Sequence, residues 1–248
     1  MKSKSVKMNL EICANSYKSA INAQKAGAHR IELCSELAVG GITPSYGMIK
    51  QVVNSLKIPV YVLIRPRSSN FTYSDNEFNI MKQDILICKE LGCQGIVSGI
   101  LNRDNTIDIE KTQELVALTK PLSFTFHRAF DCVINPFESI KELKKIEVDR
   151  VLTSGQNTSA EKGIKRLIEL KDKVNNSISI MPGGGINSEN VKLFKNAGFR
   201  EFHCSASTLY QVNEIPKVSM NSQKLFDERI VSYSEIDKIK AILNNINN

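Results

Sequence analysis

Two strand-like segments of the chain each carry a glutamate and a cysteine two residues apart. They are Glu11 with Cys13, and Glu32 with Cys34. Successive residues of a β-strand face opposite sides of a sheet, so each pair is expected on one face. Thiolates suit Cu(I) and zinc, and neighbouring strands lie only about 4.8 Å apart. Cys13 and Cys34 are therefore candidate metal ligands, able to hold Cu(I) linearly, although a buried cysteine is also common as a small apolar residue.

A histidine and an aspartate follow a later strand-like segment, in the stretch from His127 to Asp131. Histidine exchanges protons near neutral pH, so His127 is a candidate acid or base, and Asp131 a group that orients it or binds substrate. Glu11 and Glu32 add carboxylates whose pKa a low-dielectric interior would raise. These four are the candidate catalytic residues. His127 or His203 also offers an imidazole to a metal held by cysteines.

Arginines and a glycine-rich turn suggest an anion site. By strand alternation Arg65 and Arg67 share a face, and their guanidinium groups are expected to pair with Glu11 or Glu32, or to hold an anionic ligand. Glycines let backbone N–H groups approach an anion closely. The candidate anion- or substrate-binding residues are Arg65, Arg67, Gly183, Gly184, Gly185, His203 and Ser205. The structural alternative is that ion pairs satisfy a polar interior and the glycines form a tight turn.

Strand-like and helix-like segments alternate along the whole chain. Strands are expected near 8–13, 29–35, 59–65, 95–100, 122–128, 150–154, 178–182 and 200–205. Helices are expected near 16–26, 44–56, 75–91, 108–119, 135–146, 159–174, 188–197 and 234–247, with 211–233 as a loop-rich excursion. Eight such units predict an α/β fold, a single-domain TIM (β/α)₈-type barrel over 1–248, whose C-terminal face collects the polar residues above. An open doubly wound sheet is less favoured, because no Gly-x-Gly-x-x-Gly follows the first strand.

The composition of the chain argues against several classes of protein function. Net charge is +7, from 33 basic and 26 acidic residues, but the lysines are scattered and tryptophan is absent, which argues against nucleic acid as a partner. The N-terminus has no apolar stretch of a signal peptide, and no run reaches the roughly 18 apolar residues of a membrane span. A cytoplasmic protein with six reduced cysteines is expected. No Cys-x-x-Cys pair indicates a zinc ribbon or a thioredoxin-type site.

The segments resemble, in this order, the CutC family of copper homeostasis proteins. The resemblance covers about residues 8–210 and is carried by Glu11–Cys13, Arg30–Ser35, Gly40–Gly41 with Thr43–Ser45, Ile64–Arg67, Tyr73–Asp75, Thr125–Asp131, Arg150–Gly155, Met181–Ile186 and Glu201–Ala206. It implies a cytosolic TIM-type barrel, often a homodimer, associated with copper tolerance or Cu(I) binding and with no assigned reaction. The chain departs from the family at His29, where an acidic residue is usual, and at Ile42, where threonine or serine is common.

Two hypotheses follow, with a bare interaction scaffold as a third. In the first, the chain is a cytosolic copper homeostasis protein that binds Cu(I) through Cys13 and Cys34. In the second, it is a barrel enzyme acting on a small anionic or phosphorylated metabolite, and whether it is an enzyme stays open. The arginines and carboxylates favour the second hypothesis, since a copper carrier needs neither. No membrane partner is expected.

Overall fold

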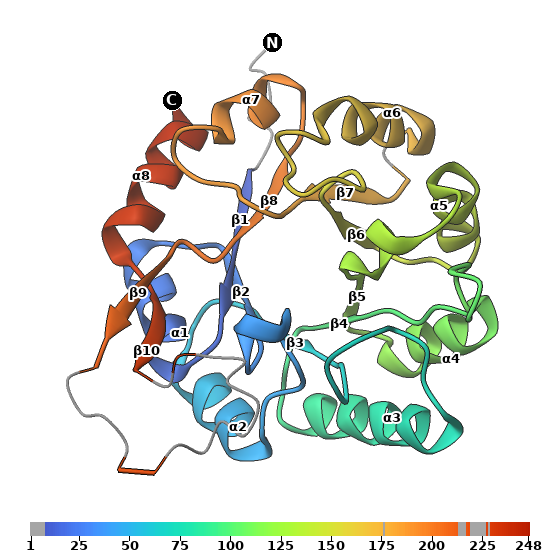
Figure 1. The fold of residues 1–248 in the computed structure, drawn as a ribbon, viewed down its shortest axis with the longest axis horizontal. Helices are drawn as coiled ribbons and strands as arrows, with labels where there is room; N and C mark the ends of the chain where they lie inside the picture. The colour runs from blue at the N-terminus through green and yellow to red at the C-terminus, as the bar shows by residue number, and fades with distance from the viewer. Residues whose placement is uncertain (1–7, 176, 213–216, 219–226, 228) are drawn as a thin grey trace.

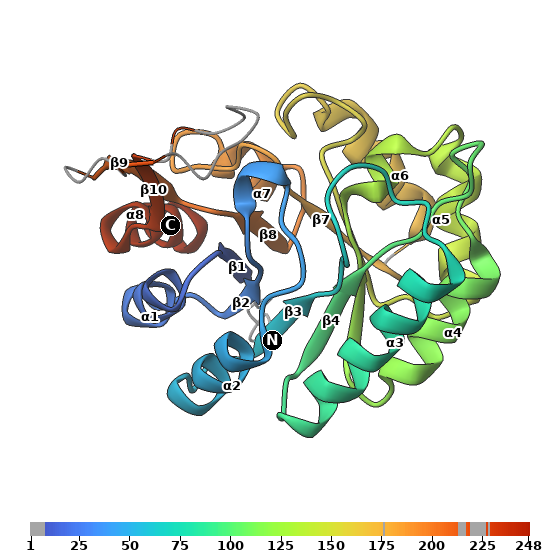
Figure 2. The same cartoon turned by 60° about the horizontal axis from the view of Figure 1, so that its bottom comes forward.

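The protein folds as a barrel of eight parallel strands surrounded by helices (Figures 1 and 2). The structure is a computed structural model that describes all residues except 1–7, 176, 213–216, 219–226 and 228. The strands are β1 (Asn9–Ala14), β2 (Arg30–Leu33), β3 (Val60–Leu63), β4 (Gly95–Ser98), β5 (Ser123–Phe126), β6 (Arg150–Thr153), β7 (Ser179–Pro182) and β8 (Glu201–Cys204). The ring runs from β7 through β1 to β8, and β8 lies beside β7. The predicted TIM-type (β/α)₈ barrel is confirmed.

The outer layer consists of helices that follow the strands. They are α1 (Tyr17–Ala26), α2 (Tyr46–Ser55), α3 (Asp75–Glu90), α4 (Ile109–Thr119), α5 (Pro136–Lys145), α6 (Ile164–Val174), α7 (Val191–Asn196) and α8 (Ile236–Asn247). Ser16 caps α1 by accepting from the Ser19 N–H, and Gly27 ends it at a φ of 92°, as the sequence predicts. In the described part of the chain, no helix has the length and apolar character needed to cross a bilayer.

Strand alternation separates the two sides of the barrel wall. Leu10 and Ile12 belong to the large core formed with the helices. Cys13 and Cys34 belong instead to a small inner cluster with Tyr61, Leu63 and Val97. The register places Glu11 opposite both Arg30 and His203, and Cys13 opposite Glu32. The predicted sharing of one face by Glu11 with Cys13, and by Glu32 with Cys34, therefore agrees with the packing.

Several element boundaries differ from the prediction. The helix expected near 188–197 is the shorter α7, because the Asn187 side chain accepts from the N–H groups of Glu189 and Asn190 and holds a turn there. The helix near 159–174 begins only at Ile164. Pro44 precedes its helix, since Ser45 is the capping residue of α2.

The loop-rich excursion expected at 211–233 lies between two strands, of which the second falls within its end. Strands β9 (Ser207–Gln211) and β10 (Ile230–Ser234) pair antiparallel outside the barrel. The Ser234 N–H donates to the Ser19 hydroxyl, which ties this hairpin to α1. Most of the intervening residues, 213–216, 219–226 and 228, lie outside those described. The final helix is present as α8.

Gly95 is the point at which β4 makes room for the Tyr61 ring inside the barrel. A Cβ at Gly95 would lie 2.5 Å from Cδ2 of that ring. The ring is held because the Arg30 and Arg150 guanidinium groups stack on it, 5.0 and 5.5 Å from its centroid. Gly95→Ala is therefore expected to lower the free energy of unfolding by about 1–3 kcal/mol, measured by urea denaturation. Gly47→Ala on α2 is the control.

The control position differs from Gly95 in its surroundings. A Cβ at Gly47 meets nothing within 4 Å, and alanine favours a helix over glycine by up to about 1 kcal/mol. Gly47→Ala should thus be neutral or stabilising. Equal stability of Gly95→Ala and the parent would show that the Tyr61 ring is free to move.

Candidate functional site

A cavity of about 330 Å³ opens at the C-terminal ends of the strands. The sequence-predicted candidates on its wall are Cys13, Glu32, Arg65, His127, Gly184, Gly185, His203 and Ser205. The rest of its wall comes from Leu37, Gly40, Leu63, Phe71, Arg128, Leu152, Ile186 and Cys204. Residues from segments far apart in the chain thus meet at one mouth, because parallel strands of a barrel all end on the same face.

The two candidate metal-ligating cysteines lie side by side. The Sγ atoms of Cys13 and Cys34 are 3.6 Å apart, and both residues are free thiols. A linear metal bridge would need the sulfurs about 4.6 Å apart, twice a metal–thiolate bond of about 2.3 Å, so the two sulfurs would have to separate to hold Cu(I) linearly.

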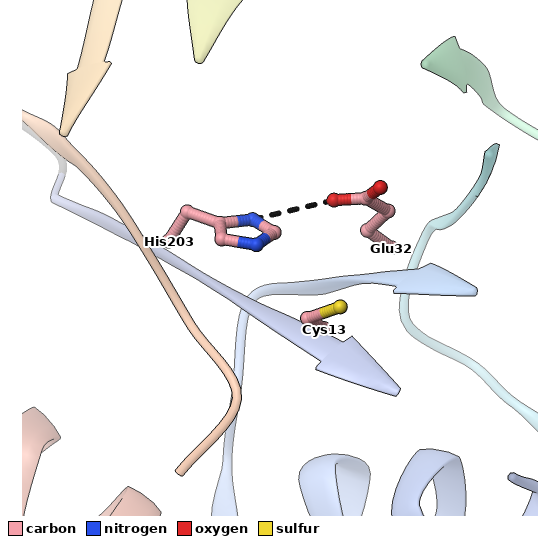
Figure 3. Close-up of side chains that lie close together, drawn as sticks. All are labelled: Cys13, Glu32 and His203. Atoms are coloured by element: carbon pink, nitrogen blue, oxygen red, sulfur yellow. Dashed lines mark ion pairs between the residues drawn. The ribbon is translucent and has the colours of Figure 1, made fainter. Parts of the chain in front are cut away.

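Glu32 and His203 lie close to Cys13. One ligand atom each from Cys13, Glu32 and His203 lies within 4.8 Å of the others. Figure 3 shows these side chains converging from β1, β2 and β8. Sulfur and imidazole are donors that suit Cu(I), whereas carboxylate suits harder ions. The clustered donors are therefore one thiol, one imidazole and one carboxylate, and Cys34 adjoins them through its 3.6 Å contact with Cys13.

Burial and neighbouring groups set the protonation of Cys13, Glu32 and His203. The hydrogen bond to Cys34, together with burial, raises the pKa of Cys13 well above the usual value. Burial also raises the pKa of Glu32 to about 7, against the opposing charge of His203. Although burial acts the other way, hydrogen bonds to Cys13 and Glu11 raise the pKa of His203. A metal that binds both Cys13 and His203 must therefore displace a proton from each of them.

A charged network lies below the cavity. Arg30 donates to Glu11 and Glu201, and Arg150 Nε donates to Glu201 Oε2 at 2.6 Å. The second oxygen of Glu11, Oε1, lies 2.8 Å from Nδ1 of His203. Glu11 has no exposed surface, and burial alone would raise its pKa, but Arg30 and His203 hold it well below the usual value. Glu11 is therefore a charged anchor for His203.

The expected pairing of Glu11 or Glu32 with Arg65 or Arg67 is wrong. Strand β3 ends at Leu63, so both arginines lie in the following loop, where strand alternation no longer directs them. The buried Arg65 guanidinium donates to the backbone carbonyls of Val39, Gly41 and Ser69. Arg67 Nε donates to Glu77 Oε1 at 2.5 Å, near the start of α3. Arg67 is absent from the cavity wall, and Arg65 is part of it.

His127 and Asp131 do not contact each other in the expected way. Nδ1 of His127 accepts from the Ala129 N–H at 3.2 Å, while burial and the charge of Arg65 lower the pKa of His127 to about 3. Asp131 instead accepts from Thr153, from the Ser154 N–H and from Arg128, whose Nε lies 2.8 Å away. The proposed orientation of His127 by Asp131 is wrong, because the turn after β5 directs Asp131 toward β6.

The glycine-rich turn after β7 meets structural demands as well as lining the cavity. Gly184 and Gly185 have φ values of 99° and 83°, which favour glycine. A Cβ at Gly183 would lie 2.4 Å from Leu152 Cδ1. Ser205 Oγ lies 3.1 Å from Ser207 Oγ. The tight-turn alternative thus accounts for the glycines, and an anion-binding role stays a prediction.

Sequence reasoning missed the charged network and part of the cavity wall. Arg30 and Glu201 each stand two residues before a predicted inward residue, Glu32 and His203, so the same alternation could have found them. Arg150 begins β6 as Arg30 begins β2. For Phe71 and Arg128 no such signal exists, because they lie outside the strands.

Fold and site together define a TIM-type barrel with paired thiols, a glutamate and a histidine at its C-terminal mouth. The sequence profile of the CutC family matches residues 8–208. The copper homeostasis protein cutC homolog of Mus musculus is 41% identical over 237 residues, covering 94% of this chain and 87% of that protein. The family protein CutC of Pasteurella multocida is 44% identical, covering 84% and 86%.

A solved structure agrees with these sequence matches. The CutC crystal structure from Streptococcus agalactiae has a TM-score of 0.75 and 38% identity, and the match covers 80% of this chain and 98% of that one. The chain belongs to the CutC family, whose curated members include proteins named for copper homeostasis. The resemblance in the sequence is thereby confirmed.

Proposed function

We propose that this protein binds Cu(I) through Cys13 and Cys34, with His203 as third ligand, and takes part in copper handling in the cytoplasm. The observation that carries the proposal is the Cys13 sulfur, which lies 3.6 Å from that of Cys34 and within 4.8 Å of a ligand atom of Glu32 and of His203. Two thiolates and an imidazole make a soft donor set, which selects Cu(I) over harder ions. The name of the mouse relative points the same way.

The surroundings favour a site that keeps its geometry. Cys34 is fully buried and Cys13 nearly so. The contact of the Glu11 carboxylate with Nδ1 of His203 leaves Nε2 as the ring nitrogen for a ligand bond. A carboxylate on the far nitrogen is the usual way in which a protein orients a metal-binding histidine. Glu11 would thus fix the direction in which His203 approaches the metal.

Removing both thiols is expected to abolish tight Cu(I) binding. Cys13→Ala with Cys34→Ala leaves at most the His203 and Glu32 donors, which are too few and too hard to retain Cu(I) against a strong chelator. The measurement is an anaerobic Cu(I) titration of reduced protein against that chelator, with circular dichroism as the folding check. The parent should bind one Cu(I) tightly.

A second pair of buried cysteines provides the control. Cys88 and Cys93 lie in the outer core around the end of α3, away from the cavity wall. Cys88→Ala with Cys93→Ala removes the same number of thiols and should keep the tight site. Retained stoichiometry in the Cys13 and Cys34 variant, or loss of binding in both variants, would contradict the proposed ligands. The homodimer implied by the family resemblance is a separate proposal, tested by sedimentation.

A further inference from the structure

His127 lines the cavity and carries a buried hydrogen-bond donor without a partner among the described residues. Its Nδ1 accepts from the Ala129 N–H, so in the neutral ring the proton is on Nε2. Nε2 is buried and has no hydrogen-bond partner among the described residues. Phe71 packs against the ring, with centroids 4.9 Å apart, and a Cβ at Gly99 would lie 2.7 Å from Nδ1. The tautomer and the orientation of His127 are therefore both held by its surroundings.

Arg65 places a buried positive charge near the same donor. The residue Arg65 is only 5% exposed. Its guanidinium group donates to the carbonyls of Val39, Gly41 and Ser69. In the described part of the chain it forms no ion pair with a carboxylate. Tyr73 nearby does not supply a charge, since burial raises the pKa of its phenol to about 12. A buried cation without a counterion is unfavourable, which leaves a negative charge to be supplied by a ligand.

The opposite wall of the cavity is also suited to an anion. Gly184 and Gly185 line it with positive-φ backbone, and the Arg128 guanidinium carbon would lie 3.4 Å from a Cβ at Gly184. Glu32 is the one carboxylate on the wall among the described residues, and it lies 3.5 Å from Nδ1 of His203. Arg128 already pairs with Asp131, so the unpaired positive charge on the wall is that of Arg65, next to the neutral His127 donor, and the one carboxylate of the wall has its own cationic partner.

We propose that this cavity binds a small metabolite through an oxyanion, a carboxylate or phosphate group, that accepts from His127 Nε2–H and neutralises Arg65. A cavity of about 330 Å³ admits a compact metabolite rather than a polymer. His127 acts here as a fixed neutral donor, in contrast to the proton-exchanging role that the sequence suggested. The site goes beyond copper binding and does not depend on it.

The test uses copper-free, reduced, full-length protein with two probes, inorganic phosphate and glycolate, at constant ionic strength. Calorimetry measures affinity, and ¹⁵N NMR follows the Nε2–H signal of His127, one of three histidines. One probe should bind saturably and shift that signal. His127→Leu should weaken binding about 10- to 100-fold, the loss of one hydrogen bond to a charged group. Preference for phosphate would indicate a phosphate ester, and preference for glycolate a carboxylate.

Arg67→Gln is the matched control, because Arg67 is a nearby arginine that pairs with Glu77 outside the cavity. This variant should bind the probe with the affinity of the parent. If His127→Leu does not fold, the Nε2–H signal of the parent decides the question. Absence of saturable binding of either probe at millimolar concentration, an unmoved His127 signal, or parent-like binding by folded His127→Leu would overturn the proposal.

Discussion

Glu11→Gln is expected to lower the free energy of unfolding by about 3–5 kcal/mol, the usual effect of breaking a buried ion pair by removing one partner. Glu11 is fully buried and contacts both Arg30 and His203. Glutamine keeps the shape of the side chain but removes its charge. The Arg30 guanidinium is then left with Glu201, which it already shares with Arg150. Urea denaturation followed by circular dichroism measures the change.

The same substitution at an exposed ion pair provides the comparison. Glu114 pairs with Lys82 at 2.8 Å, and its side chain is 52% exposed. Glu114→Gln should change the free energy of unfolding by no more than about 1 kcal/mol, since solvent screens such pairs. If both substitutions had the same small effect, the Glu11–Arg30–Glu201 network would not be a major contribution to the stability of the barrel.

Acid is expected to destabilise this protein partly through His127. Burial and the charge of Arg65 lower the pKa of His127 from 6.5 to about 3. The unfolded chain therefore binds a proton between these values while the folded protein does not, so stability is full above pH 6.5 and falls as the pH drops toward 3. At about pH 4 the loss from this one residue is about 3 kcal/mol.

The His127 contribution can be separated from that of other acid-sensitive groups by a double comparison. The unfolding free energy of the parent and of His127→Gln is measured at about pH 7 and about pH 4. His127→Gln should lose about 3 kcal/mol less than the parent over this interval, whatever its stability at neutral pH. Equal losses in the two proteins would mean that His127 accepts a proton in the folded state, and so is free to exchange one.

The cavity mouth carries two kinds of functional group, the soft thiols and the His127 donor near the buried Arg65 cation. They lie close together but differ in chemistry. Cys13 and His203 lie on β1 and β8, whereas His127 and Arg65 follow β5 and β3. All four line one cavity. Copper binding and oxyanion binding can therefore be tested independently by variants on different strands.

Much of the architecture is predictable from local patterns. Apolar residues at alternate positions, as in Leu10 and Ile12, indicate strands whose other face carries Glu11 and Cys13. Capping residues such as Ser16, and glycines such as Gly27, mark helix ends because their effects depend on neighbours in the chain. Repetition of these signals predicted the barrel, and the barrel places the strand ends together.

Which residue each charged side chain pairs with was not predictable in the same way. Arg30, rather than Arg65, pairs with Glu11 because parallel register sets the two residues opposite each other across β1 and β2. Asp131 turns toward Ser154 instead of His127 because the short helical turn after β5 redirects the chain. Register and loop path depend on contacts between distant segments, which residue spacing does not record.

The sequence by itself thus determined the alternating βα order, the inward placement of Glu11, Cys13, Glu32 and Cys34, and the family of the chain. Each of these depends on residue type and on periodicity within a short segment. The tertiary structure alone decided the 3.6 Å separation of the two thiols, the Arg30–Glu11–His203 contacts and the neutral tautomer of His127. These depend on how strands twist and meet around a closed barrel, where small shifts in register change which atoms touch.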